Sequence, residues 1–275
     1  NESCFMRLNE RILITGGSGG IGAALARRCA QAGAWPIVGY RRNAERADAV
    51  VRQCGAGETL AIDLLRDDLG LIRELPEVDA VVHCAADYSP ERSLLDDSAK
   101  TERLLKANVV GPLRLTAALA ARANRLRHVL FILSSAAFCR GSGPYALSKA
   151  SSLAAARLLA NELAPQGIFV DAVAPGWTET ALAQRAAECS GRKLAQIAAE
   201  HIGGLLQPDD VAEVCATLLF DRSPDHAPQL VVFDRRDSPE PVWQPLHPVG
   251  WALPTVTLAT ALGGQCPPIG RASRP

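Results

Sequence analysis

A glycine-rich turn between an apolar run and a helical pattern constrains the fold of this chain most. Arg11–Thr15 is a short β-rich run, and the glycine cluster Gly16–Gly22 follows it directly. Residues 23–32 then show helical spacing of apolar positions and stop at Gly33. A glycine cluster is often only a loop. Between a strand and a helix, however, its N–H groups can hold a pyrophosphate that approaches the backbone closely. The order therefore predicts dinucleotide binding. The candidate contacts are Gly16, Ser18, Gly19, Gly20 and Ile21.

Strand and helix patterns alternate from residue 11 to about residue 234. This alternation predicts an α/β fold, a Rossmann-type doubly wound parallel sheet with helices on both faces. Ligands are expected at the carboxyl ends of the strands. We expect strands over 11–15, 35–40, 59–62, 79–86, 127–133, 167–173 and 229–233. We expect helices over 23–32, 43–53, 98–122, 145–163, 181–204 and 208–220.

The ends of the chain differ from this pattern. Residues 1–10 form an N-terminal segment, residues 11–234 the NAD(P)-binding domain, and residues 235–275 a proline-rich tail. The tail is predicted to be extended or poorly ordered, with Trp243 and Trp251 as the residues able to pack on the body.

Charge and composition exclude several classes of partner and site. Lys+Arg and Asp+Glu both total 29, so no net field recruits nucleic acid or an anionic membrane. No apolar run reaches the ~18–20 residues of a membrane span, and the first residues lack the apolar core of a signal peptide. The eight cysteines are scattered without a C-x-x-C pair, which favours free thiols in a reducing cytoplasm over disulfides or a metal site. We therefore expect a cytoplasmic protein.

The end of the second predicted strand bears on the choice of cofactor. An acidic residue at this position takes the ribose hydroxyls in NAD-binding units, whereas this chain reads Tyr40-Arg41-Arg42. Two guanidinium groups suit a 2′-phosphate, so Arg41 and Arg42 predict NADP(H). The alternative is a solvated turn leading into the next helix.

Two further strand ends carry candidate cofactor contacts. Asp63, followed by Leu64, could accept a hydrogen bond from an adenine amino group or simply cap the next turn. Cys84, Ala85 and Ala86 are small enough to let a cofactor lie against the backbone. His83, just before them, is more typical of a packed strand residue than of a catalyst.

Tyr145 and Lys149 are the candidate acid–base pair. If the segment is helical, positions i and i+4 share one face. The ammonium then favours the phenolate and lowers the tyrosine pKa, which makes the tyrosine a usable proton donor or acceptor. Most Tyr-x-x-x-Lys pairs are solvated helix faces. Asn108 beside Pro112 could hold a water, or could be a tolerated polar residue at a kink.

Together these motifs resemble the short-chain dehydrogenase/reductase family in its single-domain branch, over roughly residues 10–234. The similarity is greatest to NADPH-using 3-oxoacyl-[acyl-carrier-protein] reductases. The motifs are Thr15-Gly16-x-x-x-Gly20-x-Gly22, Asn108-Val109-Val110-Gly111, Ser135, Tyr145, Lys149, Pro175-Gly176 with Thr178 and Thr180, and Pro208 with Asp210-Val211-Ala212.

The resemblance implies a catalytic role for four of these residues. Tyr145 would donate a proton to the carbonyl oxygen, and Lys149 would lower the pKa of Tyr145 and hold the nicotinamide ribose. Ser135 would hydrogen-bond the substrate oxygen, and Asn108 would fix a water for Lys149. Asn108, Tyr145 and Lys149 also count among the cofactor contacts. The segment Pro175–Thr180 would lie beside the nicotinamide.

Three departures from the family pattern stand out. The interval from Ser135 to Tyr145 is ten residues, shorter than usual. Cys84-Ala85-Ala86 replaces the usual Asn-Ala-Gly, a form similar to the larger nucleotide-sugar branch. The last strand ends in Asp234-Arg235-Arg236 instead of Asp-Gly-Gly, so the tail could alter the subunit contact made there.

These features predict an NADP(H)-dependent oxidoreductase that reduces a ketone or a 3-oxoacyl thioester. The alternatives are a binding or sensor protein of low activity and an epimerase or dehydratase of a sugar nucleotide. The expected partner is a small carbonyl or alcohol substrate, with an acyl chain as one possibility. The expected assembly is a homodimer or homotetramer.

Overall fold

The computed structural model describes residues 9–66, 77–91, 93–121, 125–138, 143–220 and 227–246. Within these ranges the chain forms one sheet. Its strands are β1 (Arg11–Thr15), β2 (Trp35–Tyr40), β3 (Glu58–Ala61), β4 (Ala80–His83), β5 (His128–Ile132), β6 (Phe169–Pro175), β7 (Gln229–Phe233) and β8 (Val242–Pro245).

The sheet has the order β3-β2-β1-β4-β5-β6-β7-β8. Strands β1 to β7 pair in parallel, for example Leu13 with Ile37 on one side and with Val81 on the other. Strand β8 pairs antiparallel with β7. The order reverses beside β1, as in a doubly wound Rossmann-type sheet. The predicted fold class is confirmed.

The helices connect successive strands. The α-helices are α1 (Gly20–Gln31), α2 (Ala44–Cys54), α4 (Ser98–Leu105), α5 (Gly111–Ala120), α6 (Gly143–Leu163), α7 (Ala181–Cys189), α8 (Leu194–Ala198) and α9 (Pro208–Phe220). Three short elements complete the set, the π-helix η1 (Lys106–Val110) and the 3₁₀-helices η2 (Ser135–Phe138) and η3 (Ala164–Gln166).

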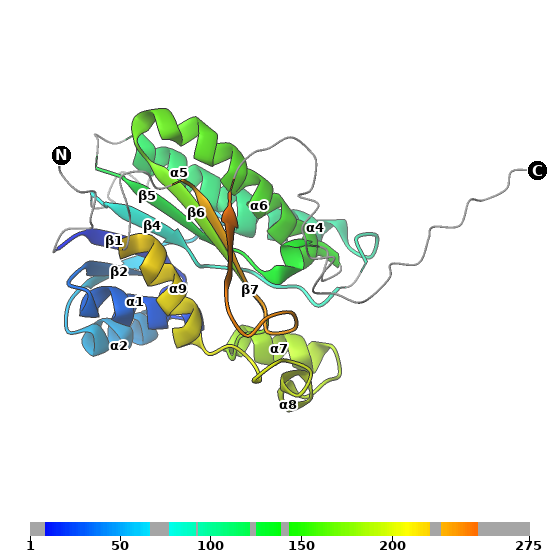
Figure 1. Ribbon diagram of the computed structural model, residues 1–275. Coiled ribbons are helices and arrows are strands. Elements are labelled where there is room, and N and C mark those ends of the chain that lie inside the picture. Colours follow the sequence, from blue (N-terminus) through cyan, green and yellow to red (C-terminus); the bar gives the residue numbers. More distant parts are fainter. Residues whose placement is uncertain are drawn as a thin grey trace, which may run out of the picture.

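Two apolar cores lie on opposite faces of the sheet. Successive side chains of a strand point to opposite faces. Accordingly, Ile12 and Ile14 join the core under α1, α2 and α9, whereas Leu13 joins the core under α5 and α6. Figure 1 shows these two helical layers, with α1, α2 and α9 on one side of the strands and α4, α5 and α6 on the other. The all-apolar strands follow from this two-sided burial.

The structure corrects the sequence-based elements at three places. The helix expected over 98–122 is divided into α4, η1 and α5, and the helix over 181–204 into α7 and α8. The strand ending at Phe233 is not the last, because β8 lies inside the segment that was predicted as a tail. Leu246, just beyond β8, is fully buried in the core that contains Leu230. Trp251 and the first eight residues lie outside the described part.

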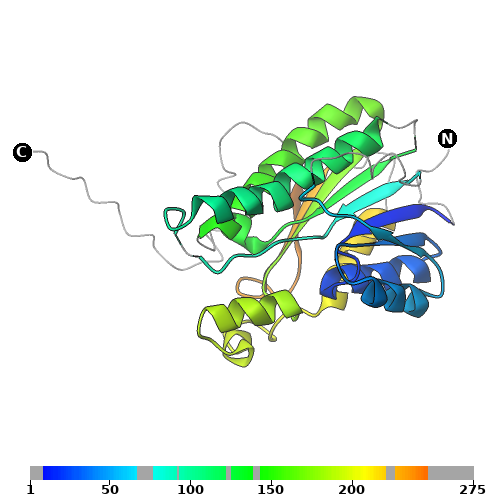
Figure 2. The same cartoon turned by 180° about the vertical axis from the view of Figure 1, so that it is seen from behind.

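Helices α7 and α8 lie apart from the two layers, at the end of the sheet where the parallel strands terminate (Figure 2). The carboxyl ends of β1, β4, β5 and β6 point toward this side. That is the edge where ligands bind in open α/β sheets. Among the described residues, none of the helices has both the length and the apolar character needed to cross a membrane.

Candidate active site

The glycine turn after β1 is packed tightly against the end of β4. Gly16 has a φ of +66°, which favours glycine, and a Cβ there would lie 2.8 Å from Cα of Ala85. The hydroxyl of Thr15 accepts hydrogen bonds from the N–H groups of Cys84 and Ala85, at 3.1 and 3.2 Å. The turn and the small residues after β4 therefore form one continuous backbone surface.

Two more glycines of the turn allow close contacts at the start of α1. A Cβ on Gly22 would lie 2.5 Å from the carbonyl oxygen of Gly16. A Cβ on Gly20 would lie 2.5 Å from Cγ2 of Thr180, which caps α7 through its hydroxyl. A side chain on either glycine would thus separate segments that meet at the N-terminus of α1. Gly19, in contrast, has no neighbour within 3.4 Å of such a Cβ.

A cavity of about 790 Å³ runs along the carboxyl ends of the strands. Of the residues predicted from the sequence, all except Asn108 line it. These residues are Gly16, Ser18, Gly19, Gly20, Ile21, Arg41, Arg42, Asp63, Leu64, Cys84, Ala85, Ala86, Ser135, Tyr145, Lys149, Pro175, Gly176, Thr178 and Thr180. The topology therefore brings nineteen positions from seven separate segments to one cavity. Their presence there does not by itself assign a function to any of them.

One end of the cavity is rich in arginine. Arg41 and Arg42 are exposed there, and neither makes a hydrogen bond or ion pair within the described residues. Asn43 caps α2 by accepting a hydrogen bond from the N–H of Arg46 at 2.8 Å. Two guanidinium groups without a described partner and a helix N-terminus are groups that favour an anion.

Asp63 lies on the same side of the cavity. Its carboxylate accepts a hydrogen bond from the N–H of Leu65 at 3.1 Å, so it caps the turn after β3. The capping alternative is thus observed, and contact with an adenine stays a prediction.

Tyr145 and Lys149 share one face of α6 at the centre of the cavity. The Nζ atom of Lys149 lies 5.8 Å from the centre of the Tyr145 ring and donates to the carbonyl of Ile132 at 3.0 Å. Burial raises the pKa of Tyr145 to about 12, although a hydrogen bond with Ser134 opposes the shift. Burial also lowers the pKa of Lys149 to about 8.

The expected lowering of the Tyr145 pKa by Lys149 is therefore wrong for the protein alone. Lys149 is buried and Tyr145 is half-buried, and the loss of solvent around each penalises its charged form. The ammonium also points to a backbone carbonyl and not to the phenol oxygen.

Asn108 does not line the cavity and instead makes hydrogen bonds between neighbouring segments. A proline at position 112 cannot donate to the carbonyl four residues earlier, which is that of Asn108, and the hydroxyl of Ser152 donates to this carbonyl instead at 2.9 Å. The side-chain amide of Asn108 donates to Ser148 and to the carbonyl of Asp87, and its oxygen accepts from the N–H of Asp87. Asn108 thus joins η1 to α6 and to the segment after β4. Its predicted role in holding a water stays a prediction.

The two serines after β5 have different partners. Ser134 is hydrogen-bonded to Tyr145. Ser135, the predicted catalytic serine, accepts a hydrogen bond from Nη2 of Arg236 at 3.1 Å and is hydrogen-bonded to Asp234. The sequence analysis missed Ser134, although the Ser134-Ser135 doublet was the available signal. The loop between Ser135 and Tyr145 includes residues 139–142, which lie outside the described part.

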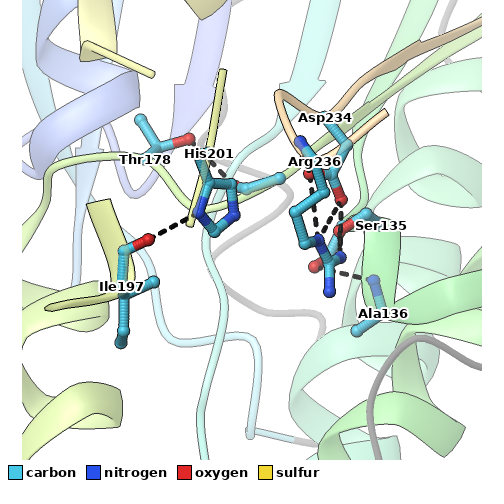
Figure 3. Close-up of polar contacts among 9 residues, drawn as sticks. Ser135, Ala136, Thr178, Ile197, His201, Asp234 and Arg236 are labelled. Atoms are coloured by element: carbon cyan, nitrogen blue, oxygen red, sulfur yellow. Dashed lines mark hydrogen bonds and ion pairs between the residues drawn. The ribbon is translucent and has the colours of Figure 1, made fainter. Parts of the chain in front are cut away.

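The buried Asp234 and the half-buried Arg236 form an ion pair beside the serines, and both were missed as site residues. Nε and Nη2 of Arg236 donate to the carboxylate of Asp234 at 2.6–3.1 Å (Figure 3). Burial alone would raise the pKa of Asp234, but hydrogen bonds from Arg236 and Ser135 outweigh it and hold the pKa below its usual value. The unusual Asp234-Arg235-Arg236 sequence was the signal for this pair.

His83 is a core residue, as expected. Its Nε2 lies 2.8 Å from the hydroxyl of Thr116, and its ring packs on Phe131 at 4.8 Å between centroids. Burial lowers its pKa to about 3, so the ring is neutral. It does not line the cavity.

Comparison with known proteins covers the same region. A family model described as Enoyl-(Acyl carrier protein) reductase matches residues 16–234. An uncharacterized oxidoreductase of Methylorubrum extorquens strain AM1 is 30% identical over 224 residues, covering 76% of this chain and 90% of that protein. The 3-oxoacyl-[acyl-carrier-protein] reductase FabG of Escherichia coli is 29% identical over 223 residues, covering 77% of this chain and 90% of that protein.

Two solved structures are similar in fold and sequence. A short chain dehydrogenase from Burkholderia cenocepacia J2315 in complex with NADP is 28% identical with a TM-score of 0.71, covering 83% of this chain and 98% of that chain. BdcA in complex with NADPH is 25% identical with a TM-score of 0.71, covering 83% of this chain and 94% of that chain. The matched region in each case includes most of the sheet.

Proposed function

Since the chain belongs to the short-chain dehydrogenase/reductase family of oxidoreductases, we propose that it is an NADPH-dependent reductase of a carbonyl compound, either a ketone or an oxoacyl thioester. One observation carries the proposal. A single cavity contains the glycine turn, two unpaired arginines, and the pair Tyr145–Lys149.

The residues present fit NADP(H). The backbone around Gly19 is open enough for a pyrophosphate at the N-terminus of α1. Arg41 and Arg42 have no protein partner in the described part and would pair with a 2′-phosphate. Two similar structures hold NADP or NADPH, which supports the same preference. When bound, the cofactor supplies the hydride.

The protein's own side chains would supply the proton and bind the substrate oxygen. With its pKa raised to about 12, Tyr145 keeps its proton at neutral pH and is suited to donate it to the oxygen that becomes an alkoxide. Ser134 is hydrogen-bonded to Tyr145, so we propose that it contacts the same oxygen, as was expected for Ser135 from the sequence. Lys149, with a pKa of about 8, can exchange protons near neutral pH and so return one to Tyr145.

The Tyr145→Phe variant tests this assignment. It should lower kcat for NADPH oxidation by about 10²–10⁴-fold, because the proton donor is lost. The dissociation constant of NADPH, measured by fluorescence, should stay within about twofold. A panel of ketones and oxoacyl thioesters supplies the substrates. Tyr88→Phe is the matched control, since Tyr88 lines the same cavity edge-on to Tyr145 at 5.2 Å and has no assigned proton.

Two results would contradict the proposal. Equal loss of activity in both variants would refute the specific role of Tyr145. Tight NADPH binding without turnover of any compound would instead support the alternative of a binding or sensor protein. That alternative has no use for the buried acid–base pair.

A further inference from the structure

We propose that Arg236 binds an acid group of the substrate, so that the natural substrate is a short oxo acid with the acid group next to the carbonyl or one carbon away. This inference rests on the proposed reductase function. It names a binding residue and a chemical class, 2-oxo and 3-oxo acids.

Arg236 lines the cavity, whereas its ion-pair partner Asp234 does not. The side chain of Asp234 is 1% exposed, that of Arg236 is 32% exposed, and only Arg236 lines the cavity. The carboxylate holds Nε and Nη2 of Arg236 by three hydrogen bonds (Figure 3). The guanidinium is therefore fixed in direction by a group that the substrate does not meet.

One nitrogen of this guanidinium, Nη1, has no partner among the described residues. A guanidinium has five N–H donors, and those that are engaged belong to Nε and Nη2, which bind Asp234 and Ser135. Nη1 makes no hydrogen bond to any described residue. An anionic oxygen, as in a carboxylate or phosphate, is the strongest hydrogen-bond acceptor for such a charged N–H group.

The other charges at this end of the cavity also favour an anion. Asp87 and Glu91 line it, but Asp87 pairs with Arg103 and Glu91 with Lys100. Arg185 lines the cavity from α7, is exposed, and has no partner in the described part. Asp237 also acts on Arg236, but it does not line the cavity. Among these cavity-lining charges, Arg185 is thus the one without a described partner, and it adds positive charge to the wall.

The position of Arg236 sets the length of the substrate. Ser134 contacts Tyr145, and the next residue, Ser135, contacts Nη2 of Arg236 at 3.1 Å. The proton donor and the guanidinium are thus linked through two consecutive serines on one short stretch of wall. The proposed substrate reaches both, so we expect its acid group to lie only a few bonds from the carbonyl. Hydride and the Tyr145 proton then give the corresponding hydroxy acid.

The test compares a 2-oxo acid and a 3-oxo acid with their methyl esters as substrates of the full chain. The measured quantity is the ratio of kcat/KM for acid over ester. In the wild type it should exceed about ten, because a charge-assisted hydrogen bond is worth about ten- to hundredfold in binding. In Arg236→Gln the ratio should fall at least tenfold, and Arg236→Lys should restore part of it.

A second variant guards against misfolding. Arg236→Gln leaves the buried Asp234 unpaired, whereas Asp234→Asn with Arg236→Gln leaves no buried charge. The double variant should show the same low ratio. A wild-type ratio near one, or a ratio unchanged in the double variant although both rates fall, would overturn the inference.

A binding measurement separates this inference from the proposed function. Calorimetric titration of the NADP⁺-saturated protein should show binding of the 2-hydroxy or 3-hydroxy acid that is lost in the double variant. If no compound is reduced but this binding is seen, the reductase proposal fails and the acid site stands. If esters and ketones are reduced but the acid neither binds nor reacts better, the reductase proposal stands and the acid site is refuted.

Discussion

Replacing Gly22 by alanine should disturb the turn that shapes the cofactor site. The new Cβ would lie 2.5 Å from the carbonyl oxygen of Gly16 and 2.9 Å from Cα of Gly17. Both atoms belong to backbone, so no flexible side chain can move away. The turn must shift by about 1 Å to reach ordinary van der Waals distance, and Gly16 begins it in a left-handed conformation.

The net cost of Gly22→Ala follows from two opposing effects. Overpacking of this kind costs about 1–3 kcal/mol. Alanine within α1 regains about 0.5–1 kcal/mol over glycine. We therefore expect the free energy of unfolding to fall by about 1–2 kcal/mol, and the melting temperature by about 2–8 °C for a domain of this size. NADPH binding should weaken as well, since the displaced turn is the proposed pyrophosphate site.

Gly19→Ala is the matched control. Its backbone is extended, with φ −106°, and the nearest atom to a Cβ is 3.5 Å away. Its cost to stability should stay below about 1 kcal/mol, the range for an N-cap change. The added methyl group faces the cavity, so NADPH binding should still weaken.

Urea unfolding and NADPH titration of both variants measure the two effects separately. A Gly22→Ala protein as stable as the wild type would refute the reasoning on close approach. A Gly19→Ala protein that binds NADPH normally would show that the pyrophosphate does not lie over this turn.

Three further predictions concern charge, cofactor choice and the end of the chain. Lys149 has a pKa of about 8 when folded against 10.5 as its ordinary value, so the folded state releases this proton first and stability rises with pH. The unfolding free energy of the wild type minus that of Lys149→Met should rise by roughly 2 kcal/mol between pH 7 and 9.5, and a flat difference would contradict the lowered pKa. Arg41→Asp should shift the NADPH/NADH ratio of kcat/KM toward NADH at least tenfold, and an unmoved ratio would refute the phosphate site. A chain ended after Leu246 should keep its stability, whereas one ended after Asp234 loses β8 and the buried Leu246 and should unfold at lower urea; equal midpoints would contradict a role for β8 in the core.

Much of the fold followed from local pattern. The apolar run Arg11–Thr15 and the glycines after it define a strand, a turn and a helix within some twenty residues. Repeating that alternation gives a parallel sheet, because the crossovers leave few other arrangements. The carboxyl ends of parallel strands lie at one edge of the sheet. The candidate residues predicted at the ends of different strands therefore line one cavity.

The breaks within the predicted helices were harder to predict from the sequence. Pro112 predicted an interruption of the helix. The π-helix η1 was not predictable, however, because the carbonyl of Asn108 accepts its hydrogen bond from Ser152, and Ser152 belongs to the neighbouring helix α6. Strand β8 was not predicted, because the prolines around it are unfavourable for a strand. Its pairing with β7 compensates for weak local propensity, as tertiary contacts do at sheet edges.

The sequence by itself determined the glycine turn, the alternation of strands and helices, and the spacing of Tyr145 and Lys149, since each depends on neighbours within a few residues. Only the tertiary structure decided the electrostatics of the site. Burial raised the pKa of Tyr145, where the helical spacing alone predicted a decrease. Arg236 reached Ser135 across 101 positions of sequence, and Ser134 instead contacted Tyr145. Desolvation and long-range hydrogen bonds depend on what surrounds a group in space, and no local pattern records that surrounding.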